Sequence, residues 1–242
     1  MEKKTIIVVG AGKGLGNHIA KKFGKEGFRV VLMARNEQSL NEYKKELEGE
    51  GIETYIHTAD AAKPETLTDA INWVKDTLGT PDVLAYNVGI TASDDAAKLD
   101  SETLKSHYQV DVASAYRCIK DVVSDEFAQK KGAILLTGGG LAHYPVSGFM
   151  PLSLDKAALR TMTYLLHDEL KPKGIFVGTV TVCGTIGIDS FFAPARIADN
   201  FWKLYTDRNE VEILHEYPQL KDSNLSAAEY WAKVYALKGL VE

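Results

Sequence analysis

The chain has 242 residues, of which 45% are hydrophobic, and a formal net charge of -5. This length and composition are enough to bury one substantial core, so we expect a single domain over residues 1–242. Lysines and arginines form no basic cluster that could neutralise phosphates, which argues against nucleic acid as a partner. No apolar run reaches the roughly 20 residues of a membrane-spanning helix, so we expect a soluble protein without a membrane partner.

The two cysteines and the first residues bear on the compartment. Cys118 and Cys183 are far apart in the sequence, and no CxxC pair is present. The first residues run directly into a strand-like segment instead of a signal peptide. We therefore expect the protein to be located in the reducing environment of the cytoplasm.

Strand-like apolar runs alternate with helix-like stretches along the chain. The runs lie at 5–9, 28–33, 52–58, 82–86, 132–137 and 175–182. Helices are expected to begin near Gly14, Glu37, Pro64, Ser101 and Leu152. Apolar strands separated by helices favour a parallel sheet covered on both faces, so the predicted class is a doubly wound, Rossmann-like α/β fold.

The last third of the chain adds elements to this pattern. Residues 211–217 could supply a seventh strand, and 194–205 and 225–237 have helical patterns. From about residue 187 onward we expect a helical cover on the substrate side, followed by a C-terminal tail. Four aromatic residues in this part are expected to cover a pocket, namely Phe191, Phe192, Trp202 and Tyr205.

A glycine-rich segment follows the first expected strand and precedes a helix. Glycines at this junction allow a sharp turn and a close approach of a pyrophosphate to the helix N-terminus; the alternative is an ordinary tight turn. The spacing Gly10-xxx-Gly14-x-Gly16 resembles the fingerprint of the short-chain dehydrogenases/reductases. The resemblance implies cofactor contacts from Gly10, Gly12, Lys13, Gly14, Leu15 and Gly16.

The resemblance extends over residues 4–190 and bears on the choice of cofactor. In family members that prefer NAD, an aspartate usually ends the second strand, and this chain has Ala34 there. Arg35 and Lys13 resemble the basic pair that binds the 2′-phosphate of NADP in other members. The resemblance therefore implies NADP(H), while the alternative for each side chain alone is a solvated surface charge.

Further cofactor contacts are implied along the same resemblance. Asp60, followed by Ala61, matches the acidic residue that contacts the adenine, although it could instead cap a helix. Asn87 and Gly89 match the asparagine-rich motif after the fourth strand. Gly184 and Ile186 fit the segment after the sixth strand near the nicotinamide.

The catalytic positions depart from the family pattern. In the family, a tyrosine protonates the carbonyl oxygen, a serine binds that oxygen, and a lysine and an asparagine complete the set. Lys156 matches the lysine, but the tyrosine position holds Leu152 and the serine position holds Gly139. Asp111 stands at the asparagine position. A second register, with the tyrosine seven residues before the lysine, holds Phe149.

The remaining polar residues include two candidate substitute acids and no set of metal ligands. His143 and Tyr144, in the loop after the fifth strand, are candidate proton donors; the alternative is that they are packing or surface residues. The histidines show no metal-ligand spacing, so we expect no metal.

Two functions follow as hypotheses. The first is a divergent NADP(H)-dependent oxidoreductase acting on a small carbonyl or activated alkene, slow because the tyrosine and serine are replaced. The second is a catalytically silent NADP-binding sensor or subunit partner. The resemblance further implies a homodimer or homotetramer that pairs long helices at about 101–130 and 152–170.

Overall fold

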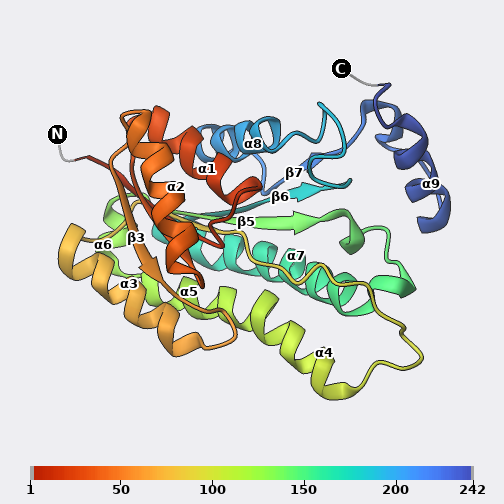
Figure 1. Cartoon of the computed structure of the whole chain (residues 1–242), viewed down its shortest axis with the longest axis horizontal. Helices are drawn as coiled ribbons and strands as arrows, with labels where there is room; N and C mark the ends of the chain where they lie inside the picture. The colour runs from red at the N-terminus through yellow and green to blue at the C-terminus, as the bar shows by residue number, and fades with distance from the viewer. Residues whose placement is uncertain (1–2, 241–242) are drawn as a thin grey trace.

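The computed structural model describes residues 3–240, and a parallel sheet lies at its centre (Figure 1). Within these residues the sheet has seven strands in the order β3-β2-β1-β4-β5-β6-β7, and every neighbouring pair is parallel. The strands are β1 (Thr5–Val9), β2 (Arg29–Ala34), β3 (Thr54–Thr58), β4 (Val83–Tyr86), β5 (Ala133–Gly139), β6 (Phe176–Val182) and β7 (Glu212–His215). The doubly wound fold is therefore confirmed, and the segment at 211–217 supplies the seventh strand.

Helices cover both faces of the sheet, because each parallel crossover must return the chain over one face. One face packs against α1 (Leu15–Lys25), α2 (Glu37–Gly49) and α8 (Pro194–Asp207). The other face packs against α3 (Pro64–Leu78), α5 (Ser114–Val122) and α7 (Met150–Leu170). Short 3-10 turns occur at Gly140–Ala142, Ser147–Phe149, Lys171–Lys173 and Pro218–Leu220.

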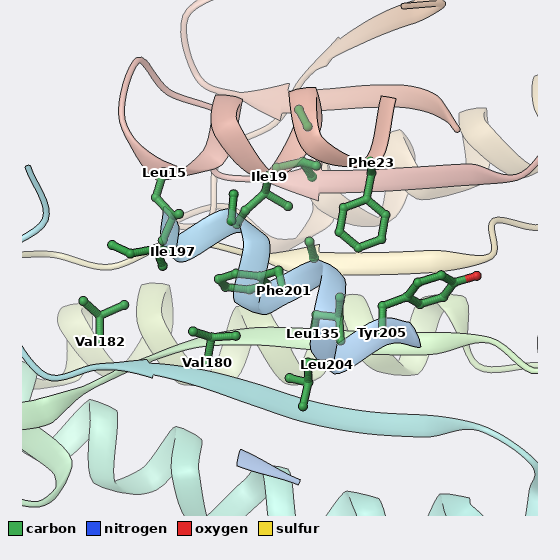
Figure 2. Packing of buried hydrophobic residues seen from close by; sticks show 14 of the residues in the cluster. Leu15, Ile19, Phe23, Leu135, Val180, Val182, Ile197, Phe201, Leu204 and Tyr205 are labelled. Atoms are coloured by element: carbon green, nitrogen blue, oxygen red, sulfur yellow. The ribbon is translucent and has the colours of Figure 1, made fainter. Parts of the chain in front are cut away.

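Alternating side chains divide the core into two layers. On β1, Ile6 and Val8 point to the α1 side, whereas Ile7 and Val9 point to the α3 side. Figure 2 shows the first layer, in which Phe201 of α8 lies between α1 and the sheet. The side chains on both faces of β1 are buried, which explains why such strands are continuously apolar in sequence.

The helix expected at 101–130 is interrupted, and that expectation was wrong in its extent. The helix α4 (Ser101–Tyr108) passes into a π-helical turn at Gln109–Ala113 before α5 begins. The helix α5 then ends at Val122, because Val123 is extended and Ser124 caps the separate short helix α6 (Asp125–Gln129) by accepting from the Phe127 N–H at 3.1 Å.

The last helix, α9 (Ala227–Leu237), lies beyond the carboxyl ends of β5 and β6 (Figure 1). It begins with a capping box in which Ser226 and Glu229 bond each other's backbone N–H. Over residues 3–240, no helix is both long and apolar enough to cross a membrane.

Candidate active site

The glycine segment after β1 forms an open cradle at the N-terminus of α1. A Cβ on Gly10 would lie 2.4 Å from the Asn87 carbonyl oxygen, and one on Gly16 would lie 2.4 Å from the Gly10 carbonyl oxygen. These two glycines therefore permit close backbone packing. A Cβ on Gly12 or Gly14 would meet no atom within 4 Å, so the backbone there faces open space. The cradle has room for a phosphate group beside the first N–H groups of α1.

A cavity of about 360 Å³ continues from this cradle toward β2 and β3. It brings together most residues expected on the adenine side, namely Gly10, Ala34, Arg35, Asp60, Ala61, Asn87 and Gly89. Asp60 also accepts a hydrogen bond from the Ala62 N–H at 3.0 Å, but it does not cap α3, whose N-cap position is Lys63. Lys13 is exposed and does not line this cavity.

Asn87 joins the cofactor cradle to the strand that carries the catalytic positions. Its side-chain amide donates to the Gly10 carbonyl at 3.1 Å, and its oxygen accepts from the Thr137 hydroxyl at 2.9 Å. A side chain bonded to both β1 and β5 fixes the relative position of their carboxyl ends.

A larger cavity, of about 800 Å³, lies over the carboxyl ends of β4, β5 and β6. It contains both the cradle residues Gly14 and Leu15 and the catalytic position Lys156. Its remaining walls come from five segments, represented by Gly89, Gly139, Phe149, Leu152, Gly184, Ile186, Trp231 and Tyr235. The crevice at the strand ends is the usual ligand site of open α/β sheets.

Lys156 lies at the inner end of this cavity and is 8% exposed. Its Nζ donates to the Thr137 carbonyl oxygen at 3.0 Å, and its stem passes Gly139, where a Cβ would lie 3.1 Å from the Lys156 Cγ. Burial lowers the pKa of Lys156, while the nearby carboxylates of Asp111 and Asp155 act in the opposite direction.

Asp111 is placed beside Lys156 by the π-helical turn between α4 and α5. Both carboxylate oxygens accept from the Ile90 N–H, at 3.0 and 3.2 Å. Gly89 passes between the two charged groups, since its Cβ would lie 3.3 Å from the Lys156 Nζ and 3.4 Å from the Asp111 Oδ2. Burial raises the pKa of Asp111, against the effect of Lys156. Local π-helical geometry of this kind frequently marks functional positions.

Asp155 is a second buried carboxyl group at this place, which the sequence analysis missed. It is fully buried, and neither of its oxygens has a hydrogen-bond partner among residues 3–240. Burial, together with the neighbouring Asp111, raises the pKa of Asp155 to about 7. The spacing in the sequence could have indicated its burial. Asp155 lies three residues after the buried Leu152 and four before the buried Leu159, which places it on the apolar face of α7.

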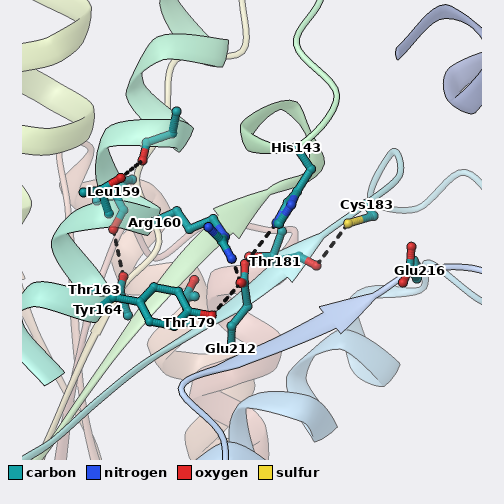
Figure 3. A network of polar contacts seen from close by, with 12 residues as sticks. His143, Leu159, Arg160, Thr163, Tyr164, Thr179, Thr181, Cys183, Glu212 and Glu216 are labelled. Atoms are coloured by element: carbon teal, nitrogen blue, oxygen red, sulfur yellow. Dashed lines mark hydrogen bonds and ion pairs between the residues drawn. The ribbon is translucent and has the colours of Figure 1, made fainter. Parts of the chain in front are cut away.

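The two expected substitute acids, His143 and Tyr144, lie in the loop after β5 and outside the cavity. The His143 Nε2 lies 3.3 Å from a carboxylate oxygen of Glu212, in a polar network that includes Arg160 (Figure 3). The Tyr144 ring stacks on Tyr230 with 3.6 Å between centroids. Neither side chain lines the cavity, because each is held by a partner on the C-terminal side of the chain.

The expected aromatic cover is wrong in its residues. Trp202 and Tyr205 of α8 pack against Phe23 of α1, and Phe192 is fully buried in the same core. None of the four expected aromatic residues lines the cavity. The C-terminal aromatic residues that do line it are Trp231 and Tyr235. Their four-residue spacing in a helical segment could have indicated that they share one face of α9.

Among residues 3–240, no three His, Cys, Asp or Glu side chains are grouped as metal ligands. The functional arrangement is thus a glycine cradle, an adenine-side cavity and a buried lysine at the end of a parallel sheet. This combination is typical of dinucleotide-binding α/β proteins.

Comparison with known proteins defines the class further. The chain belongs to the short chain dehydrogenase family, whose model matches residues 4–190. A diacetyl reductase, (S)-acetoin forming, from Staphylococcus epidermidis is 28% identical over 175 residues, which are 72% of this chain and 68% of that protein. An uncharacterised oxidoreductase from Bacillus subtilis is 26% identical over 223 residues, 88% of this chain and 83% of that protein.

The fold is also close to that of solved structures. L-Sorbose reductase from Gluconobacter frateurii, solved with NADPH and L-sorbose, superposes with a TM-score of 0.83 at 21% sequence identity. The match covers 92% of this chain and 98% of that protein, so the shared fold extends beyond the segment matched by the family model. The chain is therefore a short-chain oxidoreductase by family and by fold.

Proposed function

We propose that this protein is an NADP(H)-dependent reductase of a small, uncharged carbonyl compound or activated alkene. The observation that carries the proposal is the continuity of one cavity from the glycine cradle to Lys156. A dinucleotide bound along it would have its pyrophosphate at Gly12 and Gly14 and its nicotinamide end near Gly184 and Ile186. The binding of NADPH by L-sorbose reductase, which shares the fold, supports this choice of cofactor.

The bound cofactor supplies a hydride, and the chain supplies binding and orientation. The N–H groups at the start of α1, which no side chain caps, would bind the pyrophosphate. Asp60 lines the cavity proposed for the adenine, and Lys156 lines the cavity in which it would bind a ribose hydroxyl. The neighbouring Asp111 carboxyl group acts against burial and raises the pKa of Lys156.

The phosphate-bearing cofactor is favoured by the residues at the end of β2. Ala34 introduces no carboxylate there, and Arg35 lines the adenine-side cavity. Neither Arg35 nor Lys13 forms a salt bridge within the described part of the chain. Both cations are therefore available to a 2′-phosphate.

The Arg35→Ala variant is expected to bind NADPH about 10 to 100 times more weakly, because one charge-assisted contact is worth roughly 1.5 to 3 kcal/mol. Its affinity for NADH should change little. Fluorescence titration with both cofactors measures this, and Lys45→Ala on the exposed face of α2 is the control. Equal affinity of the wild type for the two cofactors would contradict the NADP(H) assignment.

The substrate part of the cavity favours uncharged ligands. Leu141, Val146, Phe149 and Leu152 form its walls, and these side chains offer no charge to a carboxylate or phosphate substrate. Leu152 and Gly139 remove the phenol and the hydroxyl that relatives use. The loss of a general acid typically costs about 10² to 10⁴ in rate, so slow turnover is expected unless another group donates the proton.

A catalytically silent NADP-binding sensor or subunit partner is the second candidate. It is favoured by one observation, that both tyrosine registers hold apolar residues which line the cavity. The deciding experiment measures NADPH binding by fluorescence and NADPH oxidation with a panel of ketones, diketones and enones. Binding with turnover supports the reductase, binding without turnover supports the sensor, and absence of NADPH binding contradicts both.

A further inference from the structure

We propose that the hydroxyl of Tyr235, on the C-terminal helix α9, binds the substrate carbonyl oxygen and donates the proton that the missing tyrosine at position 152 cannot supply. The inference rests on the proposed reductase function and assigns a further catalytic residue to it. Tyr235 and Lys156 line the same large cavity.

Few of the cavity's side chains can donate a proton to a substrate. The Thr137 hydroxyl donates to Asn87, the Trp231 indole N–H donates to the Tyr144 carbonyl at 2.9 Å, and the Lys156 ammonium is held at the inner end by the Thr137 carbonyl. Two aliphatic hydroxyls remain, at Thr91 and Thr185. Tyr235 carries the only phenol in the lining, and a phenol is a far stronger acid than an aliphatic alcohol.

Tyr235 lies on a helix that Tyr230 and Trp231 attach to the rest of the protein. The Tyr230 ring is fully buried and stacks on Tyr144, and its hydroxyl donates to the Cys183 carbonyl at 3.3 Å. The Trp231 bond to the Tyr144 carbonyl adds a second attachment to the loop after β5. Because Trp231 and Tyr235 are four residues apart, they share one face of α9, the face that forms a wall of the cavity.

A proton donor must also regain its proton after each turnover, and the exposure of Tyr235 allows this. Tyr235 is 58% exposed, so water can return a proton to its oxygen after each turnover. In the proposed reaction, a hydride from NADPH forms a C–H bond at the carbonyl carbon and leaves NADP⁺. The electron pair of the carbonyl π bond then forms an O–H bond with the proton of the Tyr235 hydroxyl. The tyrosinate oxygen is then reprotonated by water, and the product is an alcohol.

The walls around Tyr235 also define the substrate class. Phe149 and Trp231 add aromatic surface to the cavity that Tyr235 lines, which favours a carbonyl compound with an aryl or other apolar substituent. A suitable probe is 1-phenylpropane-1,2-dione, and propylbenzene is its matched analogue without carbonyl groups.

Binding and turnover test the inference separately. Of the three tryptophans, Trp231 is the one that lines the cavity, so quenching of its fluorescence reports binding without turnover. The Tyr235→Phe variant is expected to bind the dione about 3 to 10 times more weakly, as for the loss of one hydrogen bond, and to bind propylbenzene like the wild type. If Tyr235→Phe binds both probes more weakly by the same factor, or binds both like the wild type, Tyr235 does not contact the carbonyl oxygen.

In turnover with NADPH and the dione, Tyr235→Phe should lower kcat by about 10² or more, with a much smaller change in KM. Tyr55→Phe, which removes a hydroxyl on the far edge strand β3, is the matched control and should keep wild-type kcat. Wild-type kcat in Tyr235→Phe overturns the proton-donor role while leaving the reductase function intact. Absence of turnover in the wild type overturns the reductase function, and the binding contrast then still decides whether Tyr235 contacts the carbonyl oxygen.

Discussion

The family resemblance implies a tyrosine where this chain has Leu152 and a serine where it has Gly139, and both side chains can be introduced. Leu152 lines the cavity, and Gly139 has an extended backbone that a serine can adopt. A serine Cβ would lie 3.1 Å from the Lys156 Cγ, so the lysine stem must shift by a few tenths of an ångström.

The Gly139→Ser/Leu152→Tyr variant is expected to reduce an activated ketone with NADPH at least about 10 times faster than the wild type. It regains a proton donor and a hydroxyl for the carbonyl oxygen, although the gain is partial because catalytic groups act as a unit. The control is Gly139→Ser/Leu152→Phe, which has the same ring without its hydroxyl. Equal rates for the two variants would show that ring packing, and not acid catalysis, explains any gain.

The buried Asp155 predicts an unusual dependence of stability on pH. Burial and the nearby Asp111 raise the pKa of Asp155 from 3.8 to about 7, so between these values the folded protein holds a proton that the unfolded chain has released. The free energy of unfolding should therefore fall as the pH rises through this window, by at most about 4 kcal/mol at about 1.4 kcal/mol per pKa unit.

Asp155→Asn should remove this loss, because an amide does not ionise. The variant is expected to be more stable than the wild type at pH 8 and similar to it at pH 4.5, as measured by urea unfolding. Asp168→Asn, on an exposed position of the same helix, is the control. A difference from wild type that is the same at both pH values would rule out ionisation of Asp155 as its cause.

At the scale of elements, a buried carboxylate joins three segments that lie far apart in sequence. Glu212 on β7 accepts from Arg160 of α7 at 2.8 Å and from the Thr181 hydroxyl of β6 at 2.6 Å, and it lies 3.3 Å from His143 (Figure 3). Burial by itself would raise the pKa of Glu212, but hydrogen bonds from His143 and Thr181 and the charge of Arg160 lower it to about 2. The network attaches the edge strand and the loop after β5 to α7.

Glu212→Gln is expected to lower the free energy of unfolding by about 2 to 3 kcal/mol at pH 7, since a depressed pKa contributes stability above the unfolded value of about 4.5. The difference from wild type should shrink as the pH falls from 4.5 toward 2. Chemical denaturation over this range measures it, with the exposed Glu210→Gln as the control. A deficit that stays constant down to pH 2 would mean that the charge of Glu212 is not its source.

Most elements could be predicted because each leaves a local signal. The strands are apolar runs, and α3 begins with a proline in its first turn, where a missing N–H costs nothing. The π-helical turn at 109–113 has no comparable signal, since its sequence continues the helical pattern and only packing selects the wider turn. That turn decides where Asp111 lies.

At the scale of the whole molecule, one helical face has exposed apolar side chains. Leu154 and Leu165 lie three turns apart on one face of α7 and are 48% and 66% exposed, and Tyr108 of the adjacent α4 is 49% exposed. Ile119 of α5 and Leu159 of α7 are buried in the core and are not free for a partner. A homodimer or homotetramer paired through α4 and α7 would cover the exposed group.

Light scattering at micromolar concentration is expected to show a dimer or tetramer of the 26.6 kDa chain. Leu165→Glu should shift it toward the monomer, because a carboxylate is costly to bury in an apolar contact. Lys45→Glu on α2, at the opposite face of the sheet, should leave the assembly unchanged. A wild type that is monomeric at these concentrations would rule out this pairing.

The sequence by itself determined the class of fold, and it predicted the cofactor cradle and the replacement of the family's serine and tyrosine. Those features depend on local periodicity, on glycine spacing and on residue identity at fixed distances from Lys156, all of which are local along the chain. Only the tertiary structure decided which other groups reach the cavity. His143 and Tyr144 are turned away by contacts with Glu212 and Tyr230, whereas Tyr235, almost 80 residues after Lys156, enters its wall. Such contacts join segments far apart in sequence, and their formation depends on the packing of the complete fold.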